Sequence, residues 1–347
     1  MSGTLAIPCN SVGDHDQPGK DWNELFRAEL VPVVGNSSND VLVWAISGAV
    51  TTATITDQFT SGARRYHDRY AASDHFAHLF AQAIAATGIA IAPRPTILDL
   101  GSGSGANSVV PCRRLFPGAR IVATDLSAEL LAMLAGDLSQ GQAPGEILCV
   151  QMDAMSEHVA PAAFDLVTGA SILHHLDSPE DGIAAAGRAL KPGAHAIFFE
   201  PFHGWAIMRL AFERVLVESR LRGEPLDSEV EAPLRQLIDD VRLRSILNDR
   251  RGPAFERMDD KWLFSSTRIK AAGLAAGFSQ VRLVPHNDHA TLYRDSAAVH
   301  LRLATGRSDL ALPPWAVEIL DAFDSAMTLH AKRELMLEGA IVMTKAE

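Results

Sequence analysis

Glycine and acidic residues are grouped after residue 97 in a spacing that could bind a nucleotide. Ile97–Asn107 has the sequence ILDLGSGSGAN, an apolar run followed by Gly101, Gly103 and Gly105. Glycine lacks a Cβ atom, so the backbone can turn tightly against a ligand, and a helix that follows presents free N–H groups. Asp125 ends the next apolar run, RIVATD, where a carboxylate can accept hydrogen bonds from both hydroxyls of a ribose.

This glycine pattern also has alternative interpretations. Residues 101–106 also fit the Gly-x-Gly-x-x-Ala spacing of dinucleotide-binding proteins, so a nicotinamide-dependent oxidoreductase is one rival function. The glycines could also form only a tight strand-to-helix turn, and Asp125 could cap the next helix. Asp153, in the loop after the following apolar run, is placed to meet an adenine edge or is a plain loop acid.

Candidate catalytic side chains follow two later apolar runs. His174 and His175 follow FDLVTGASIL, and Glu200 and His203 lie at and just after the end of the run 194–200. Ligands bind beyond the carboxyl ends of parallel strands, and a histidine of near-neutral pKa suits proton removal. We predict His174 or His203 as the proton acceptor, with Glu200 orienting His203 or binding the substrate, and expect His175 to be structural.

The sequence predicts no metal site and no disulfide. His75 and His78, like His286 and His289, are pairs three residues apart without a third ligand, which is typical of surface histidine. The three cysteines are odd in number and widely separated, which indicates a reducing cytoplasm.

The elements that must position these residues alternate between strand and helix patterns, which predicts a doubly wound α/β domain with a parallel sheet covered on both faces. The predicted strands are 96–100, 120–125, 147–150, 164–169 and 194–200. After a break, the sheet pattern resumes at 268–276, 281–284 and 339–343.

Four segments fall outside this alternation. Val41–Ile55 is apolar but too short to span a membrane, which predicts a buried helix or, alternatively, a contact with lipid or with a second copy in a homodimer. Residues 57–88 predict a helical N-terminal cover. Residues 202–261 predict a helical cap over the substrate pocket, and its apolar side chains indicate a hydrophobic substrate. Residues 285–336 form a second, irregular insertion.

Together, five motifs resemble the class I S-adenosylmethionine-dependent methyltransferase family, in its small-molecule branch. The motifs are DLGSGSG (99–105), DLS (125–127), QMDA (151–154), FDLVTGASILHHL (164–176) and LKPG (190–193). The resemblance is close over about 57–201 and looser over 262–285 and 338–344. It implies a Rossmann-like, seven-stranded, mostly parallel sheet with an antiparallel final hairpin, and S-adenosylmethionine as cofactor.

The resemblance also implies a role for each matching residue. It places Asp99 near the methionine amino group, Gly101 and Gly103 with Ser102 against the cofactor backbone, Asp125 with Leu126 at the ribose, Asp153 and Ala154 at the adenine, and Ala170 beside the sulfonium. Tyr66 and Tyr70 match aromatic positions that close over the methionine end.

We therefore expect four regions: a tail and helical segment (1–56), a cofactor-binding core (57–201), the cap (202–261) and the remainder of the core (262–347). The expected activity is methyl transfer to a small organic acceptor, at oxygen or carbon. A relative that binds the cofactor without transferring methyl is a further alternative. The net charge of −11 argues against a nucleic acid partner, and no secretory signal or transmembrane segment is visible.

Overall fold

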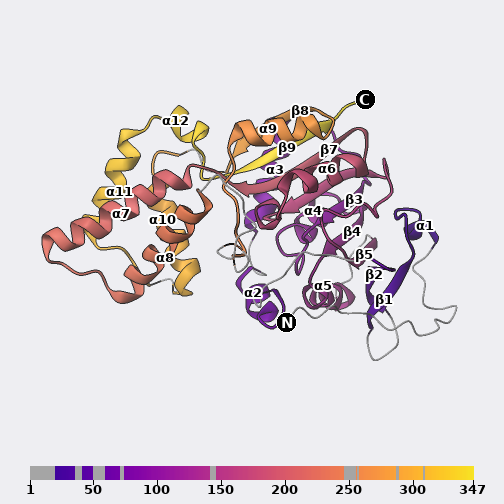
Figure 1. Cartoon of the computed structure of the whole chain (residues 1–347), viewed down its shortest axis with the longest axis horizontal. Coiled ribbons are helices and arrows are strands. Elements are labelled where there is room, and N and C mark those ends of the chain that lie inside the picture. Colours follow the sequence, from indigo (N-terminus) through magenta and orange to yellow (C-terminus); the bar gives the residue numbers. More distant parts are fainter. Residues whose placement is uncertain are drawn as a thin grey trace.

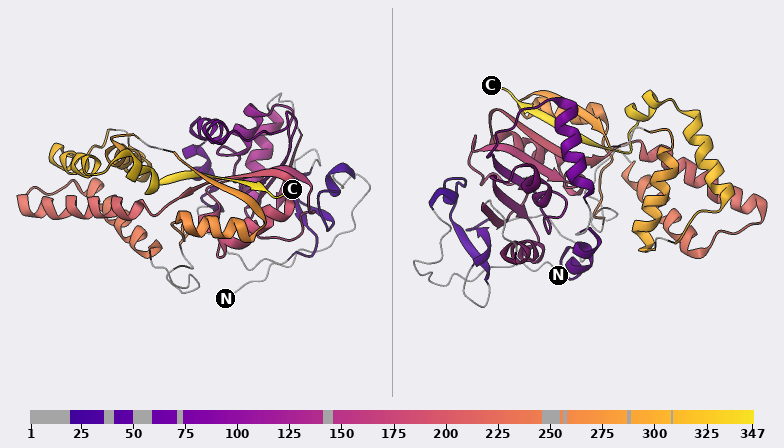
Figure 2. Two further views of the ribbon diagram at one scale, coloured as in Figure 1. Left: turned by 90° about the horizontal axis from the view of Figure 1, so that it is seen from above. Right: turned by 180° about the vertical axis from the view of Figure 1, so that it is seen from behind.

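The chain folds into a twisted nine-stranded sheet with helices on both faces, and a separate group of helices extends from one edge of it (Figure 1, Figure 2). The structure is a computed structural model. It describes residues 20–35, 41–49, 59–70, 74–140, 146–245, 255, 258–286, 289–307 and 309–347.

The sheet has the strand order β1-β2-β5-β4-β3-β6-β7-β9-β8. The strands β2, β5, β4, β3, β6 and β7 run parallel to one another. Strand β1 is antiparallel to β2, and β9 is antiparallel to both β7 and β8. The strands are β1 (Leu30–Gly35), β2 (Val41–Ile46), β3 (Thr96–Leu100), β4 (Arg120–Asp125), β5 (Glu146–Gln151), β6 (Phe164–Ala170), β7 (Leu190–Pro201), β8 (Phe278–Pro285) and β9 (Glu338–Lys345).

Helices cover the sheet or form the group at its edge. They are α1 (Lys20–Asn23), α2 (Ala63–Tyr70), α3 (His75–Thr87), α4 (Val109–Leu115), α5 (Ala128–Gln140), the 3-10 turn η2 (Leu173–His175), α6 (Pro179–Ala189), α7 (Trp205–Arg222), α8 (Ser228–Arg244), α9 (Ser266–Ala275), α10 (Leu292–Thr305), α11 (Pro314–Ala326) and α12 (Leu329–Glu334). None of the helices in the described ranges has the length and apolar character needed to span a bilayer.

Alternation along the strands separates two cores. Strand side chains such as Phe198 pack with α6 and α9 on one face, and Phe199 packs with α3 on the other. Burying both faces is what makes the central strands continuously apolar. It also places Glu200, the next residue of β7, on the α6 face. The predicted doubly wound, Rossmann-like α/β fold is confirmed.

The structure corrects the number and kind of some elements. The sheet has two strands more than the seven expected, because β1 and β2 pair antiparallel and β2 continues the sheet beside β5. The described part of Val41–Ile55 begins with strand β2 and not with a buried helix: β-branched and aromatic residues complete the sheet edge there. Residues 268–276 lie mostly in helix α9, and the second insertion contains helices α10 to α12.

The two insertions meet in one helical unit, formed by α7, α8, α10, α11 and α12, that lies beside the sheet (Figure 1). Its own core includes Trp205, Met208 and Phe212 from α7 and Leu320 from α11. These apolar side chains were expected to face the substrate. Instead they pack against the second insertion, so they carry no information about the acceptor.

Candidate functional site

The predicted glycine turn connects β3 to the segment that leads into α4. Gly101 and Gly103 have positive φ angles of 65° and 53°, a left-handed conformation that glycine adopts at least cost. A Cβ atom on Gly101 would lie 2.5 Å from Cδ1 of Ile172, so this position also has no room for a side chain. The turn thus brings bare backbone to the carboxyl edge of the sheet.

Asp99 and Ser102 lie beneath this turn. The buried Asp99 carboxylate accepts hydrogen bonds from the hydroxyls of Ser102, Ser108 and Thr168 at 2.6, 2.5 and 2.7 Å. Burial raises the pKa of Asp99 to about 6 in spite of these donors. Neither Asp99 nor Ser102 is among the residues that line the pocket, so their visible role is to hold the turn in shape.

The pocket itself opens where the turn, the ends of β4 to β6 and residues 258–261 meet. Seven of the predicted cofactor residues line it: Gly101, Gly103, Asp125, Leu126, Asp153, Ala154 and Ala170. The structure therefore brings together, in one pocket, predicted residues that lie between positions 101 and 170 of the sequence.

Asp125 supplies the buried carboxylate of this pocket. Its Oδ2 accepts the Gly103 N–H and its Oδ1 accepts the Ser127 N–H, both at 2.8 Å. Burial raises the pKa of Asp125, and these backbone donors oppose the rise. Each carboxylate oxygen can accept more than one hydrogen bond, so two hydroxyls can still be bound. Asp153 is similarly fixed, because its Oδ1 accepts the Met155 N–H at 2.9 Å.

Glu200 was predicted to orient His203 or to bind the substrate, but the structure places it beneath η2. Its side chain is fully buried and accepts the backbone N–H groups of Ile172, Leu173 and His174 at 3.1, 2.7 and 3.2 Å. It also contacts Nδ1 of His174 at 2.6 Å. The carboxylate thus caps η2 and is not exposed to a substrate, and it does not orient His203.

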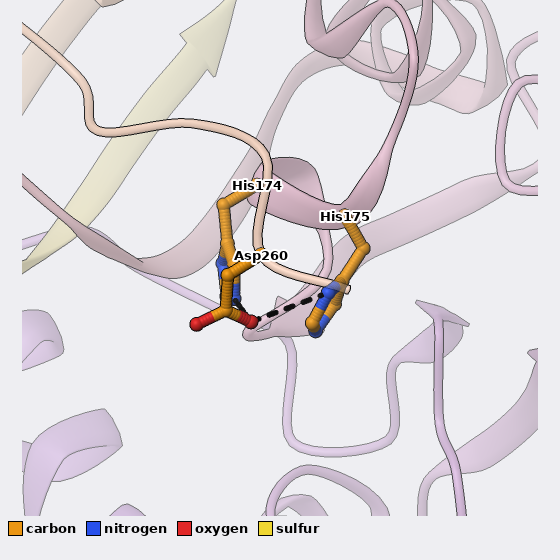
Figure 3. Close-up of side chains that lie close together, drawn as sticks. All are labelled: His174, His175 and Asp260. Carbon is orange, nitrogen blue, oxygen red and sulfur yellow. Dashed lines mark ion pairs between the residues drawn. The ribbon is translucent and has the colours of Figure 1, made fainter. Parts of the chain in front are cut away.

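His174 lies between two carboxylates, as Figure 3 shows for one of them. Its Nδ1 faces Glu200, and its Nε2 is 3.3 Å from Oδ1 of Asp260, which comes from the segment that follows α8. Burial lowers the pKa of His174, but the two carboxylates outweigh that effect and raise it to about 9. His174 is therefore a protonated bridge at neutral pH, which is the wrong state for the proton acceptor that the sequence predicted.

His175, which the sequence analysis set aside as structural, lines the pocket. Its Nδ1 is 2.8 Å from the carbonyl oxygen of Asp259, and a carbonyl only accepts, so Nδ1 carries the proton and Nε2 keeps a lone pair. Burial and the charge of His174 lower the pKa of His175 to about 3, which keeps the ring neutral. The ring of Phe59 packs edge-on against it at 5.6 Å.

Residues 258–262, which we call the strap, close one side of the pocket. Lys261 donates its N–H to the His174 carbonyl at 2.8 Å and its Nζ to the His175 carbonyl at 2.7 Å. Trp262 Nε1 donates to the Leu176 carbonyl at 2.8 Å. Arg244 Nη1 lies 3.3 Å from Asp260, which links α8 to the strap. These contacts bind the strap to η2.

His174, His175 and Asp260 each have one possible metal-ligand atom within 4.8 Å of the others, so this set has the spacing for a metal ion (Figure 3). The charges present already balance, however. His174 pairs with Glu200 and Asp260, and Asp260 pairs with Arg244 as well. We therefore interpret the set as an ion-pair network.

The remaining predicted residues do not reach the pocket or are not described. His203 is half-buried. Burial lowers the pKa of His203, and this effect exceeds the rise caused by its hydrogen bond with the Leu263 backbone. It is not among the lining residues, so it is poorly placed to act on a substrate there. The side chains of Tyr66 and Tyr70, on α2, lie outside the described residues.

Sequence reasoning missed the pocket residues that distant segments supply. Phe59 reaches it from the N-terminal end of the core, and Met258, Asp259 and Lys261 reach it from the end of the segment 202–261, which was predicted to cap the pocket but without naming these residues. Their sequence neighbourhood carries no glycine turn or strand end that would mark them. The HHL motif did offer a signal, but the sequence favoured His174, whereas His175 is the histidine that lines the pocket.

Comparison with known proteins gives one family. Residues 98–198 match the family model described as "Methyltransferase domain". The ubiquinone biosynthesis O-methyltransferase of Idiomarina loihiensis is 29% identical over 124 residues, which are 35% of this chain and 49% of that protein. The ubiquinone/menaquinone biosynthesis C-methyltransferase of Stutzerimonas stutzeri is 32% identical over 104 residues, 30% of this chain and 41% of that protein. The chain thus spans less than half the length of these curated relatives.

Solved methyltransferase structures are similar at lower identity. The phosphoethanolamine N-methyltransferase 2 of Haemonchus contortus, in complex with S-adenosyl-L-methionine, is 15% identical, with a TM-score of 0.48 over 87% of this chain and 61% of that one. A putative sarcosine dimethylglycine methyltransferase from Galdieria sulphuraria is 11% identical, with a TM-score of 0.46 over 82% and 98% of the two chains.

The family match covers β3 to β7, the same strands that carry the glycine turn, Asp125 and the pocket. The strand order β5-β4-β3-β6-β7-β9-β8 with one antiparallel strand completes the expected seven-stranded core within the larger sheet. The sequence match over residues 98–198 and this fold both agree with the resemblance to the class I S-adenosylmethionine-dependent methyltransferases.

Proposed function

We propose that the chain transfers the methyl group of S-adenosylmethionine to a small organic acceptor at oxygen or carbon. The observation that carries this proposal is the continuity of one pocket. It runs from the glycine turn and Asp125, which suit the cofactor, to His175 and the strap, which face the other side. The two curated relatives named above are an O- and a C-methyltransferase by name, which supports the same chemistry.

The acceptor side of the pocket combines apolar and polar groups. Phe59, Ile172 and Met258 supply apolar surface there, and His175, Asp177 and Lys261 supply polar groups. A pocket with apolar walls and a few polar groups suits an organic acceptor with one reacting hydroxyl or enol. This supports the hydrophobic acceptor predicted from the sequence, although on other residues than those first considered.

His175 is the group that we propose to receive the acceptor's hydrogen bond. Methyl transfer from a sulfonium has a good leaving group, so holding the nucleophile in line supplies much of the rate. The Asp259 carbonyl fixes the ring through Nδ1, and Nε2 is the acceptor atom. As the acceptor oxygen loses electron density to the incoming methyl group, its hydroxyl becomes more acidic and its proton can pass to Nε2. The predicted roles of His174 and His203 as base are replaced by this one.

The test is a screen of phenols, enols and carboxylic acids with S-adenosylmethionine, read by intact-mass analysis of the products. We expect one class of acceptor to gain a methyl group while S-adenosylhomocysteine accumulates. Cofactor binding without S-adenosylhomocysteine from any acceptor would favour the non-transferring relative instead. Oxidation of a substrate with reduced nicotinamide as product would favour the oxidoreductase.

A further inference from the structure

Lys261, in the strap, differs from the other residues that line the acceptor side of the pocket. Within the described part of the chain, it is the only lysine or arginine among the lining residues. Its side chain is 11% exposed, so the ammonium group is largely withdrawn from water. Burying a charge costs free energy unless the charge is paired and hydrogen-bonded. The partners of this ammonium group therefore indicate whether it has capacity for a ligand.

The ammonium group of Lys261 is only partly paired. Nζ donates to the His175 carbonyl oxygen at 2.7 Å. Oδ1 of Asp177 is 3.6 Å from Nζ, which is too long for a hydrogen bond, and the Asp177 side chain is 56% exposed, so water screens this pair. An ammonium group has three N–H donors. Among the described residues, the His175 carbonyl takes up one of them, which leaves donors for a ligand in the pocket.

The backbone on both sides of Lys261 is held in place. Arg244, on α8, reaches the residue before it and the residue after it: Nη1 lies 3.3 Å from Asp260, and Nη2 donates to the Trp262 carbonyl oxygen at 3.0 Å. The guanidinium of Arg268 stacks over the Trp262 ring at 3.9 Å. A binding group that is fixed in advance loses less conformational entropy when its ligand binds. The frame thus presents the ammonium group ready for a ligand.

The charges around Lys261 differ in how far they are compensated. His174 pairs with Glu200 and Asp260, and Asp260 also pairs with Arg244, so that network is balanced within itself. The positive charge of Lys261 has only the screened Asp177 carboxylate. Since an ammonium group can donate but not accept, the ligand that compensates it best is an anionic oxygen.

Lys261 also acts on His175, the residue to which its Nζ is hydrogen-bonded. Burial and the charge of His174 are the larger causes that lower the pKa of His175, and the charge of Lys261 lowers it further. The pocket wall therefore places a neutral imidazole, which accepts a hydrogen bond, beside a cation, which donates one. These two neighbours suit a ligand that carries a hydroxyl and an anionic oxygen on one carbon skeleton.

We propose that Lys261 binds a carboxylate of the acceptor, so that the substrate is a hydroxy acid whose hydroxyl faces His175. The inference rests on the proposed function for the identity of this ligand as the acceptor, but the binding that it asserts can be measured without methyl transfer. Ile172 and Met258 supply apolar surface for the carbon skeleton. S-adenosylmethionine carries a carboxylate as well, so the test must separate the acceptor from the cofactor.

The test is a calorimetric titration of hydroxy acids and their amides into the full-length chain saturated with S-adenosylhomocysteine, which has no methyl group to transfer. The pairs are salicylate and salicylamide, meta-hydroxybenzoate and meta-hydroxybenzamide, and mandelate and mandelamide, which differ chiefly in charge. The variants are Lys261→Met, Lys261→Gln, which keeps a donor without the charge, Lys261→Arg and Asp177→Asn. Lys270→Met, at an exposed position of α9, is the control. Each variant is checked for folding by circular dichroism and titrated with S-adenosylhomocysteine as well.

We expect the wild type and Lys270→Met to bind at least one acid more tightly than its amide. In Lys261→Met and Lys261→Gln, the affinity for that acid should fall about tenfold to a hundredfold, while the affinity for the amide changes little. Lys261→Arg should keep most of the preference for the acid. Asp177→Asn should increase it, because a neighbouring negative charge is removed.

Three results would overturn the proposal. The first is a wild type that prefers none of the acids to its amide. The second is a parallel loss of acid and amide affinity in the neutral variants, which would mean that Lys261 only holds the strap. The third is a loss of S-adenosylhomocysteine affinity without a loss of acid affinity, which would assign Lys261 to the cofactor. Methyl transfer without a preference for acids would contradict this inference alone, whereas a preference for acids without any methyl transfer would contradict the proposed function alone.

Discussion

The carboxylate of Asp125 joins the end of β4 to the glycine turn, through its 2.8 Å contact with the Gly103 N–H. We expect Asp125→Ala to weaken S-adenosylmethionine binding about tenfold or more, because charge-assisted hydrogen bonds contribute about 1.5 to 3 kcal/mol each. Calorimetric titration of the cofactor measures this. Asp309→Ala is the control, since Asp309 pairs with the exposed Arg307 far along the chain. Unchanged affinity in Asp125→Ala would remove Asp125 from the cofactor site.

His175 is expected to affect turnover and not cofactor affinity. In His175→Ala, kcat should fall by roughly 10² to 10⁴, while the dissociation constant of S-adenosylmethionine stays nearly unchanged. Because the pKa of His175 is lowered to about 3, the wild-type rate should not decline between pH 8 and pH 5 through protonation of this ring. His175→Gln, which keeps a hydrogen-bond acceptor, should recover part of the rate. Full activity in both variants would show that positioning by other groups is sufficient.

Residue types alone could predict residues that line the pocket but could not distinguish the environments of His174 and His175. The glycines and Asp125 occupy a contiguous strand-turn-helix and the end of the next strand, where local sequence decides geometry. The difference between His174 and His175 depends on Glu200, Asp259 and Asp260. Those partners are 26 to 86 positions away, and no local pattern reports them.

The strap and η2 form an element pair whose stability should depend on pH. His174 has its pKa raised to about 9 from 6.5 in the folded state, so its stabilising contribution is complete below about pH 6.5 and is lost as the pH rises through 9. We expect the free energy of unfolding to fall by on the order of 1 to 3 kcal/mol over this window, and the fall to be absent in His174→Gln.

Denaturant unfolding at a series of pH values measures this effect. His289→Gln is the matched control, since His289 is an exposed histidine whose nearest carboxylate, Asp295, is 3.7 Å away. If His174→Gln and the wild type lost stability in parallel between pH 6.5 and 9, the ion-pair network would not be what binds the strap.

Elements marked by a clear local pattern of apolar residues could be predicted from the sequence, whereas elements that depend on tertiary contacts could not. Strands β3 and β4 match their predicted bounds because each is a short apolar run bounded by turn residues. Val41–Ile46 has the same apolar character, yet only its pairing with β1 and β5 distinguishes a strand from a buried helix. Likewise, α7 was predicted correctly as a helix, but which surface it covers depends on α10 and α11, more than 70 residues later.

At the scale of the whole molecule, the helical unit has a hydrophobic core of its own, so we expect it to lose stability without loss of the cofactor site. Lys332 and Asp324 form a buried pair at 2.7 Å, and Asp324 also accepts the N–H groups of Tyr293 and Arg294. Lys332→Met removes one partner and leaves a buried charge, so we expect a loss of about 3 to 5 kcal/mol in unfolding free energy. Cofactor affinity should stay at the wild-type value.

Denaturant unfolding and cofactor calorimetry on the same preparation measure both quantities. Lys270→Met, in the exposed part of α9, is the control for loss of a lysine. A parallel loss of stability and of S-adenosylmethionine binding would mean that the unit and the sheet do not behave as separable parts.

The most direct measurement of the proposed methyl transfer is the ratio of S-adenosylhomocysteine to methylated product, with S-adenosylmethionine labelled in its methyl group. With a productive acceptor, the wild type should form the two in equal amounts and place the label on the acceptor. Asp125→Ala should form less of both at low cofactor concentration. S-adenosylhomocysteine that never forms with any acceptor, or that forms without a labelled product, would contradict the account.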